Sequence, residues 1–174
     1  MTISVEGLNA LSAERASELF RACCGASRWV AAMVSRRPYF SRDAVFRAAD
    51  DEWQSMDEVD WLEAFSHHPR IGESTSAAGS DATARGWSAS EQGGVASAPE
   101  ETRIGLARLN HDYETRFGFI YIVCATGRSA TELLELARAR MQNDRDTELR
   151  GAAEEQRKIT RLRLEKLLDT GAAA

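Results

Sequence analysis

The sequence predicts an all-α protein, a single-domain compact helical bundle of about eight helices over residues 1–174. Three observations favour this fold class. Apolar residues recur at the three- and four-residue spacing of helices, no series of alternating strands is present, and no segment repeats at a fixed interval. A length of 174 residues fits one domain, and 43% hydrophobic residues suffice for one core. A helical bundle is the most economical arrangement of such segments.

Four helices are expected in the first part of the chain. The first covers residues 8–24, with Gly25 as its C-cap. Ser27 is expected to cap a second helix, which must stop before Pro38 because the residue preceding a proline avoids helical dihedrals. Ser41 opens a third helix, and a fourth, short one runs up to two adjacent histidines.

The middle of the chain is expected to alternate between loop and helix. Residues 72–86 are rich in Ser, Ala, Thr and Gly, with few apolar anchors, and are predicted to form a mobile loop. A capping-box pattern predicts that a helix starts at Ser88, and a further helix covers residues 100–116. The β-branched, apolar run 119–124 is expected to be extended or irregular.

Two helices complete the chain. Ser129 repeats the capping-box pattern, and a last helix spans about residues 146–169. On that last helix Arg163 falls in the middle of the apolar stripe, whereas Arg161 lies near its edge. Arg163 is therefore expected to point inward. Either it pairs with a core carboxylate or snorkels outward, or it is a donor aimed into a binding pocket.

Charge and cysteine content limit the possible partners. The net charge is −5 and the 22 basic residues are scattered, which argues against nucleic acid or an anionic membrane as the main partner. No segment approaches the roughly 18 apolar residues of a membrane span, and the start lacks the pattern of a secretory leader. Three cysteines, two of them adjacent, argue against a disulfide framework. A cytoplasmic protein with a small-molecule or protein partner is expected, and the Ala-rich end is not a peroxisomal signal.

His68 is the first candidate for chemistry. It precedes Pro69, which is expected to end the fourth helix directly after His68 and so place the imidazole at the rim of a pocket. The alternative is a histidine that only caps the helix. His67 projects about 100° away if helical, so the two rings are not expected to share one ligand. With one other histidine and no paired-cysteine spacing, no metal site is expected.

The segment 88–92 is the second candidate. A capping box alone would explain Ser88 and Glu91. A helix start also offers free amides and a positive dipole end to an anion, and the amide of Gln92 can donate and accept hydrogen bonds.

The chain resembles the OHCU decarboxylase family over almost its whole length. No single motif decides this resemblance, but the ordered set does. The matching residues are Asn9, Phe20, Cys24-Gly25, Trp29-Val30, Arg37-Pro38, Ala64-Phe65, His68-Pro69-Arg70-Ile71-Gly72, Ser88-x-x-Glu91-Gln92, Phe117-Gly118-Phe119-Ile120, Arg140-Met141-x-Asn143-Asp144, Glu148-Leu149, Lys158-Ile159 and Arg163-Leu164.

This resemblance implies cofactor-independent decarboxylation of 2-oxo-4-hydroxy-4-carboxy-5-ureidoimidazoline to (S)-allantoin and CO2 in urate breakdown, by an enzyme that often forms homodimers. It also implies that His68 is the catalytic acid/base. Glu91 is placed with it as a residue that anchors substrate N–H groups and orients His68, and which of the two makes the first proton transfer stays open. The implied substrate-binding residues are Pro69, Ser88, Ala89, Ser90, Glu91, Gln92, Phe119, Ile120, Tyr121, Ile122, Val123 and Arg163.

Two other classes compete with this interpretation. One is a helical interaction module without catalysis, and the other is a metal-assisted hydrolase of a related ureide. Turnover in excess chelator would exclude the metal enzyme. A folded His68→Asn variant without turnover would exclude the interaction module.

Overall fold

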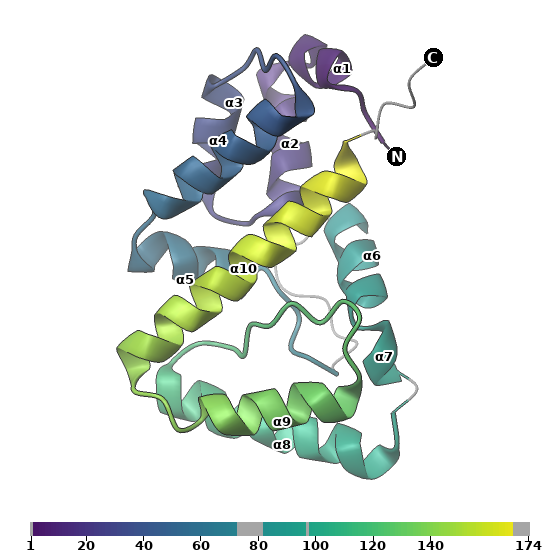
Figure 1. Cartoon of the computed structure of the whole chain (residues 1–174), viewed down its shortest axis with the longest axis vertical. Helices are drawn as coiled ribbons and strands as arrows, with labels where there is room; N and C mark the ends of the chain where they lie inside the picture. Colours follow the sequence, from purple (N-terminus) through teal and green to yellow (C-terminus); the bar gives the residue numbers. More distant parts are fainter. Residues whose placement is uncertain (1, 73–81, 97, 169–174) are drawn as a thin grey trace. The chain divides into compact units, whose positions relative to one another are not determined.

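The computed structural model describes residues 2–72, 82–96 and 98–168, which contain ten helices (Figure 1). The chain forms two compact units. The first unit is Met1–Ala64 with Arg157–Ala174, and the second is Phe65–Gln156. The helices are α1 (Val5–Ala10), α2 (Ala13–Cys23), α3 (Ser27–Ser35), α4 (Arg42–Gln54), α5 (Glu58–Ser66), α6 (Ala82–Glu91), α7 (Gly93–Ala96), α8 (Glu100–Phe117), α9 (Ala130–Arg140) and α10 (Arg145–Leu167).

The all-α prediction is confirmed. Over the described ranges the one β feature is an isolated bridge between Ile3 and Leu168, in the first unit. The count of helices is two above the predicted eight because the first expected helix is two helices, and because α7 is a short helix that no pattern indicated. None of the helices in these ranges has an apolar stretch long enough to cross a membrane.

The predicted helix over residues 8–24 is wrong in its details. Ser12 is extended and its hydroxyl accepts a hydrogen bond from the backbone N–H of Arg15, so the chain is interrupted there and α2 starts afresh. Cys24, not Gly25, caps the end of α2, with an extended backbone at φ −146°. No left-handed glycine is needed at this end.

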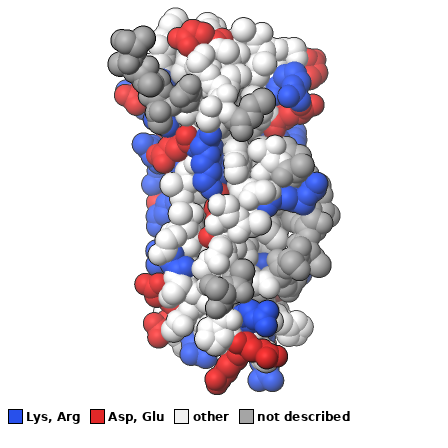
Figure 2. Space-filling model, turned by 90° about the vertical axis from the view of Figure 1, so that its right-hand side faces the viewer, with Lys and Arg blue, Asp and Glu red and all other residues white. Residues whose placement is uncertain are grey.

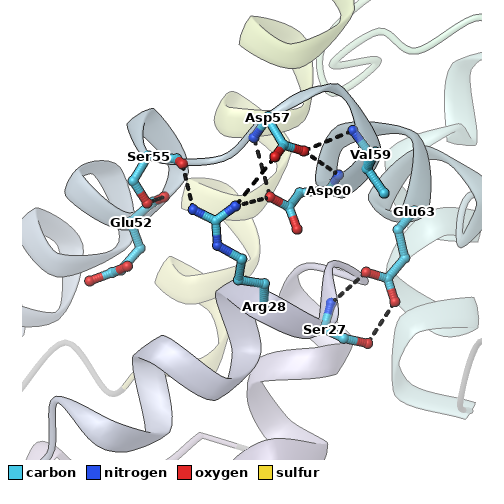
Figure 3. A network of polar contacts seen from close by, with 8 residues as sticks. All are labelled: Ser27, Arg28, Glu52, Ser55, Asp57, Val59, Asp60 and Glu63. Carbon is cyan, nitrogen blue, oxygen red and sulfur yellow. Dashed lines mark hydrogen bonds and ion pairs between the residues drawn. The ribbon is translucent and has the colours of Figure 1, made fainter.

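Helices α3 and α5 are joined by a polar network within the first unit (Figure 3). The prediction that Ser27 is the N-cap of α3 is wrong. Ser27 is the first helical residue, and its N–H and hydroxyl both donate to the Glu63 carboxylate, at 2.9 and 2.6 Å. Next to it, the Arg28 guanidinium donates to the Asp60 carboxylate at 2.6 Å and to the Ser55 carbonyl at 2.8 Å. These contacts connect α5 to α3 within the first unit.

Buried side chains of α2, α3 and α4 contribute to the core of the first unit. Phe20 and Trp29 are fully buried and meet edge to face, with ring centroids 6.0 Å apart. The indole N–H of Trp29 donates to the Ala49 carbonyl of α4 at 3.1 Å. As predicted, Ser41 caps α4, and α3 ends before Pro38.

In the second unit, α8 and α9 lie side by side (Figure 1). They approach closely at Gly105, where an added Cβ would lie 3.2 Å from a Leu134 methyl group. Gly118 adopts φ +81° and ends α8 after Phe117, one residue beyond the predicted end of the helix at 116. The capping box at Ser129 that starts α9 is confirmed, with both reciprocal hydrogen bonds present.

The predicted loop over residues 72–86 and the predicted helix start at Ser88 need correction. Residues 73–81 lie outside the described residues, but 82–86 are helical and belong to α6. Ser88 is therefore inside a helix rather than at its start. Ala84 and Ser88, one helical turn apart, are both buried, so α6 is held by packing on a face of small residues. The sequence pattern did not indicate the start of this helix because its buried face carries small residues and no large apolar ones.

The three cysteines form no disulfide, with Cys23 and Cys24 buried and Cys124 half-buried. Figure 2 shows one face of the molecule, on which Lys and Arg side chains are interspersed with Asp and Glu side chains. This mixture agrees with the scattered basic residues of the sequence.

Candidate active site

His68 lies just beyond the end of α5. The helix ends at Ser66, two residues earlier than predicted, and the His68 backbone N–H donates to the Phe65 carbonyl at 3.0 Å in a final tight turn. His68 and Pro69 are both half-buried. The histidine thus stands on a connecting segment rather than on the helix, and the next residues determine its position.

Two contacts with α8 anchor the segment that follows His68. The Arg70 guanidinium forms a forked pair with Glu114, with hydrogen bonds of 3.0 Å from Nε and 2.8 Å from Nη2. The amide of Asn110, itself buried, donates to the carbonyl of Ile71 at 2.8 Å. The His68–Gly72 segment is therefore tied to one face of α8 by side chains from two successive turns.

A third contact joins the two sequence blocks that identified the candidate site. Gly72 adopts φ +83°, and its N–H donates to the side-chain oxygen of Gln92 at 3.0 Å. Gln92 follows α6 directly, and its own N–H donates to the Ser88 carbonyl at 3.1 Å. The His68–Gly72 segment and the Ser88–Gln92 segment are thus adjacent in the second unit.

The Ser88–Gln92 segment forms the last turn of α6 rather than its first. Ser88 is buried, Ala89 and Ser90 are exposed, and Glu91 and Gln92 are half-buried. A helix end presents carbonyl oxygens and the negative end of the dipole. The predicted anion site made of free amides is therefore wrong, and this end of α6 suits hydrogen-bond donors instead.

Residues 119–123 follow α8 as an irregular segment, as predicted. Phe119, Tyr121, Ile122 and Val123 are buried, while Ile120 is half-buried. Aromatic packing holds the segment against α8, because the ring of Tyr113 meets those of Phe119 and Tyr121 with centroids 5.9 and 5.2 Å apart. Buried backbone groups here need partners other than a sheet ladder.

A buried polar network supports this segment, and sequence reasoning assigned it no role. Arg140 of α9 donates to the Ile122 carbonyl at 2.7 Å and pairs with Glu148 of α10, which is fully buried. Glu148 also accepts from the Tyr113 hydroxyl, and from the Asn143 amide at 2.8 Å. One signal was available, because Glu148 lies at four-residue spacing from the buried Ala152 and Gln156 on the same helix.

The network shifts the pKa values of its members. Burial raises the pKa of Tyr121 to about 12 and raises that of Tyr113 as well. Burial alone would lower the pKa of Arg140, but its hydrogen bond with Glu148 and the neighbouring phenols raise it. Arg140 is therefore a permanent cation beside the 119–123 segment.

Arg163 is buried, as its place on the apolar stripe of α10 predicted, while Arg161 is about half exposed. The Arg163 guanidinium donates to the Ala22 carbonyl near the end of α2 at 3.3 Å. Arg163 belongs to the first unit, whereas the other predicted site residues belong to the second. Its participation in one site with His68 stays a prediction.

Among the described residues, no group of three or more His, Cys, Asp or Glu side chains is arranged to hold a metal ion. The second unit contains an imidazole just beyond the end of α5, a carboxylate at the end of α6 and a buried irregular segment. These are the features of a helical protein with a candidate acid/base site.

Comparison with known proteins gives the family. The sequence pattern described as OHCU decarboxylase matches residues 9–165, and the chain belongs to this family. The uric acid degradation bifunctional protein TTL of Arabidopsis thaliana is 36% identical over 157 residues, which make up 90% of this chain and 48% of that protein. The 2-oxo-4-hydroxy-4-carboxy-5-ureidoimidazoline decarboxylase of Halalkalicoccus jeotgali is 27% identical over 95% of this chain and 92% of that protein.

Solved structures agree with this assignment. A crystal structure of OHCU decarboxylase in the presence of (S)-allantoin has a TM-score of 0.73 and 36% identity, over 86% of this chain and 96% of that chain. An (S)-allantoin synthase with 17% identity and a TM-score of 0.72 shares the fold. The chain spans 48% of the Arabidopsis relative and 32% and 33% of two bifunctional relatives from Bacillus.

Proposed function

We propose that this protein decarboxylates 2-oxo-4-hydroxy-4-carboxy-5-ureidoimidazoline to (S)-allantoin and CO2 in urate breakdown, without a cofactor. The observation that carries the proposal is the hydrogen bond from Gly72 to Gln92, which joins the two motif segments of the family in one place. A relative of similar length bears the name of this decarboxylase, and a similar solved structure was obtained with (S)-allantoin.

In this proposal His68 handles the protons. Its imidazole takes the proton of the substrate hydroxyl, or it protonates the carbanion or enolate that remains when CO2 leaves with the carbon–carbon bond electrons on the substrate. Proton transfer of this kind contributes roughly 10²–10⁴-fold to the rate. Protonation from one face only would produce a single enantiomer of allantoin, which the reaction in water does not.

The end of α6 suits the donor groups of the substrate. The carboxylate of Glu91 and the carbonyl oxygens of the last helical turn would accept from ureido and ring N–H groups. Glu91 would also orient His68. In the proposal, Pro69 and the other residues of the Ser88–Gln92 segment complete this side of the substrate-binding site. The position of Glu91 at the end of α6 removes the anion-binding alternative for this helix terminus and supports the N–H-binding role expected for Glu91.

Backbone groups of residues 119–123 would bind the polar edge of the substrate, because a small planar ligand rich in amides can be read by main-chain donors and acceptors. Arg163 is proposed to hold a ureido or ring carbonyl. A guanidinium clamped on the departing carboxylate would stabilise the ground state more than the transition state and would slow the loss of CO2.

We propose further that the protein acts as a homodimer in the cytoplasm. The resemblance to the family supports the dimer, and three cysteines that form no disulfide suit a reducing compartment. Sedimentation at several protein concentrations tests the dimer directly.

The experiment that tests the activity is circular dichroism of allantoin formation from freshly generated substrate, with and without excess chelator, with wild-type protein and His68→Asn. We expect optical activity to appear with wild-type protein and to fall by about 10²-fold or more in the variant. His111→Asn is the matched control, because His111 is an exposed histidine on α8.

Each alternative class predicts a different result. Slow, racemic product with wild-type protein would indicate a helical binding module and contradict the proposal. Turnover that the chelator abolishes would indicate a metal-assisted enzyme. Equal turnover by His68→Asn and wild-type protein would remove His68 from the chemistry.

A further inference from the structure

The conformation of residues 119–123 must be fixed by something other than regular secondary structure. The segment belongs to no helix or strand. A segment without a backbone ladder keeps one conformation only if side chains hold its peptide groups. Two side chains from neighbouring helices do so here.

Two consecutive peptide planes are held from outside the segment. Arg140 of α9 binds the Ile122 carbonyl at 2.7 Å, and Glu155 of α10 accepts from the Cys124 N–H at 2.8 Å. A trans peptide is planar, with its carbonyl and N–H pointing in opposite directions. Holding the Ile122 carbonyl therefore aims the Val123 N–H away from Arg140, and holding the Cys124 N–H aims the Val123 carbonyl away from Glu155.

Arg140 is itself fixed by four contacts, one of which is a 3.4 Å hydrogen bond from its Nη2 to the Tyr113 hydroxyl. Besides the Ile122 carbonyl, its guanidinium binds Glu148 through Nε at 2.7 Å and lies over the ring of Tyr121, 5.0 Å from the centroid. The Glu148 carboxylate also accepts hydrogen bonds from the Tyr113 hydroxyl and the Asn143 amide. A planar fork can serve a carboxylate and a carbonyl simultaneously, which a lysine ammonium cannot reproduce in the same geometry.

A buried ion pair of this kind contributes little net stability, because desolvation of both charges offsets their attraction. Its better-attested contribution is to specify one arrangement of the groups around it. We propose that Arg140 and Glu148 are positioning residues, which fix the peptide groups of residues 119–123 for substrate binding. This inference rests on the proposed function for the use of the segment, while the positioning itself can be measured without turnover.

The test compares Arg140→Lys with a matched control, Arg28→Lys. Arg28 of the first unit also bridges a largely buried carboxylate, Asp60, and a backbone carbonyl (Figure 3), but it does not touch the 119–123 segment. Hydrogen–deuterium exchange over peptides covering residues 119–124 measures the positioning, and steady-state kinetics with freshly generated substrate measures its use.

We expect Arg140→Lys to speed exchange in these peptides and to raise KM about tenfold, with kcat within about threefold, because main-chain contacts bind the substrate and the transition state alike. Arg28→Lys should leave both readouts at wild-type values. Unchanged exchange and KM in Arg140→Lys, or the same changes in Arg28→Lys, would overturn the proposal.

The two proposals fail separately. Wild-type protein without turnover would contradict the proposed function, and the exchange data would still decide the positioning role. If Arg140→Lys does not fold, Tyr113→Phe removes one donor to Glu148 and should increase exchange over residues 119–124 in the same direction. Wild-type exchange in that variant would overturn the inference.

Discussion

At the scale of single residues, loss of the ion pair between Arg70 and Glu114 is expected to affect activity more than stability. Both side chains are about two-fifths exposed, so the pair contributes at most about 1 kcal/mol to the free energy of unfolding. Arg70 nevertheless follows His68 by two residues and ties its segment to α8. We therefore expect Glu114→Gln to change stability little but to lower kcat about tenfold, since misplacement of a catalytic group by about 1 Å can cost up to 10²-fold.

Urea denaturation and steady-state kinetics of the same preparation measure both quantities. Glu18→Gln is the control, because Glu18 forms a similarly exposed ion pair with Arg15 in the first unit. Wild-type kcat in Glu114→Gln would show that the forked pair does not position His68. A large loss of stability would show that the pair is structural.

The sequence predicted His68 as a site residue but could not show what holds it. Residue type and position before Pro69 indicate exposure at a helix end. The partners of the following residues, Asn110 and Glu114, come from a helix about forty positions away in the chain. Arg70 belongs to a motif of the family, but its role depends on a tertiary contact that local spacing does not encode.

At the scale of elements, two identical capping patterns had different outcomes. Ser129 caps α9, and Ser88 lies inside α6. The difference lies in the preceding residues. Gly127, with φ +79°, cannot continue a helix, so α9 must start after it. The residues before Ser88 can all be helical, and the capping pattern alone says nothing about them. A capping box is therefore informative only where the preceding residues forbid a helix.

Two glycine variants test these helix boundaries. Gly118→Ala puts a Cβ on a residue at φ +81° with open space around it, so the left-handed backbone alone should cost about 1–2 kcal/mol. Gly86→Ala lies within α6, also in open space, and should stabilise the protein by about 0.5–1 kcal/mol because alanine favours the helix.

Urea unfolding curves fitted with one shared m-value give the change in the free energy of unfolding for each variant. Because the two expected changes have opposite signs, each variant serves as a control for the other. Destabilisation by Gly86→Ala would contradict a helix that includes residue 86 and would restore the predicted loop. A neutral Gly118→Ala would contradict the left-handed end of α8.

At the scale of the whole molecule, the all-α class and most helix bounds could be predicted from periodicity. The assignment of the two parts of α10 to different compact units could not. Residues up to Gln156 belong to the second unit, and those from Arg157 to the first. Periodicity shows which face of a helix is buried but not which neighbour covers it. Glu148 and Arg163 share the buried stripe of one helix, yet they contact different units. The expectation of a single domain stays a prediction.

Buried groups that ionise at high pH are present in both units and predict alkaline unfolding. Burial raises the pKa of Cys24 to about 11 in the first unit and that of Tyr121 to about 12 in the second. The unfolded chain loses these protons at its ordinary pKa values, about 8.5 for Cys and about 10 for Tyr. The stability is therefore fully present below about pH 8.5 and is lost as pH rises through the folded pKa values. Each group lowers the free energy of unfolding by about 1.4 kcal/mol per pH unit between its two values.

Urea unfolding at successive pH values, followed by helical circular dichroism and by the absorbance of ionised tyrosine, measures this loss. We expect Tyr121→Phe to make the decline shallower by about 1.4 kcal/mol per pH unit above about pH 10. Tyrosine ionisation should accompany the loss of helix, because the buried phenols titrate in the unfolded chain before they titrate in the folded one. If Tyr113 and Tyr121 ionised near their ordinary pKa with the helices intact, their burial in the second unit would be wrong.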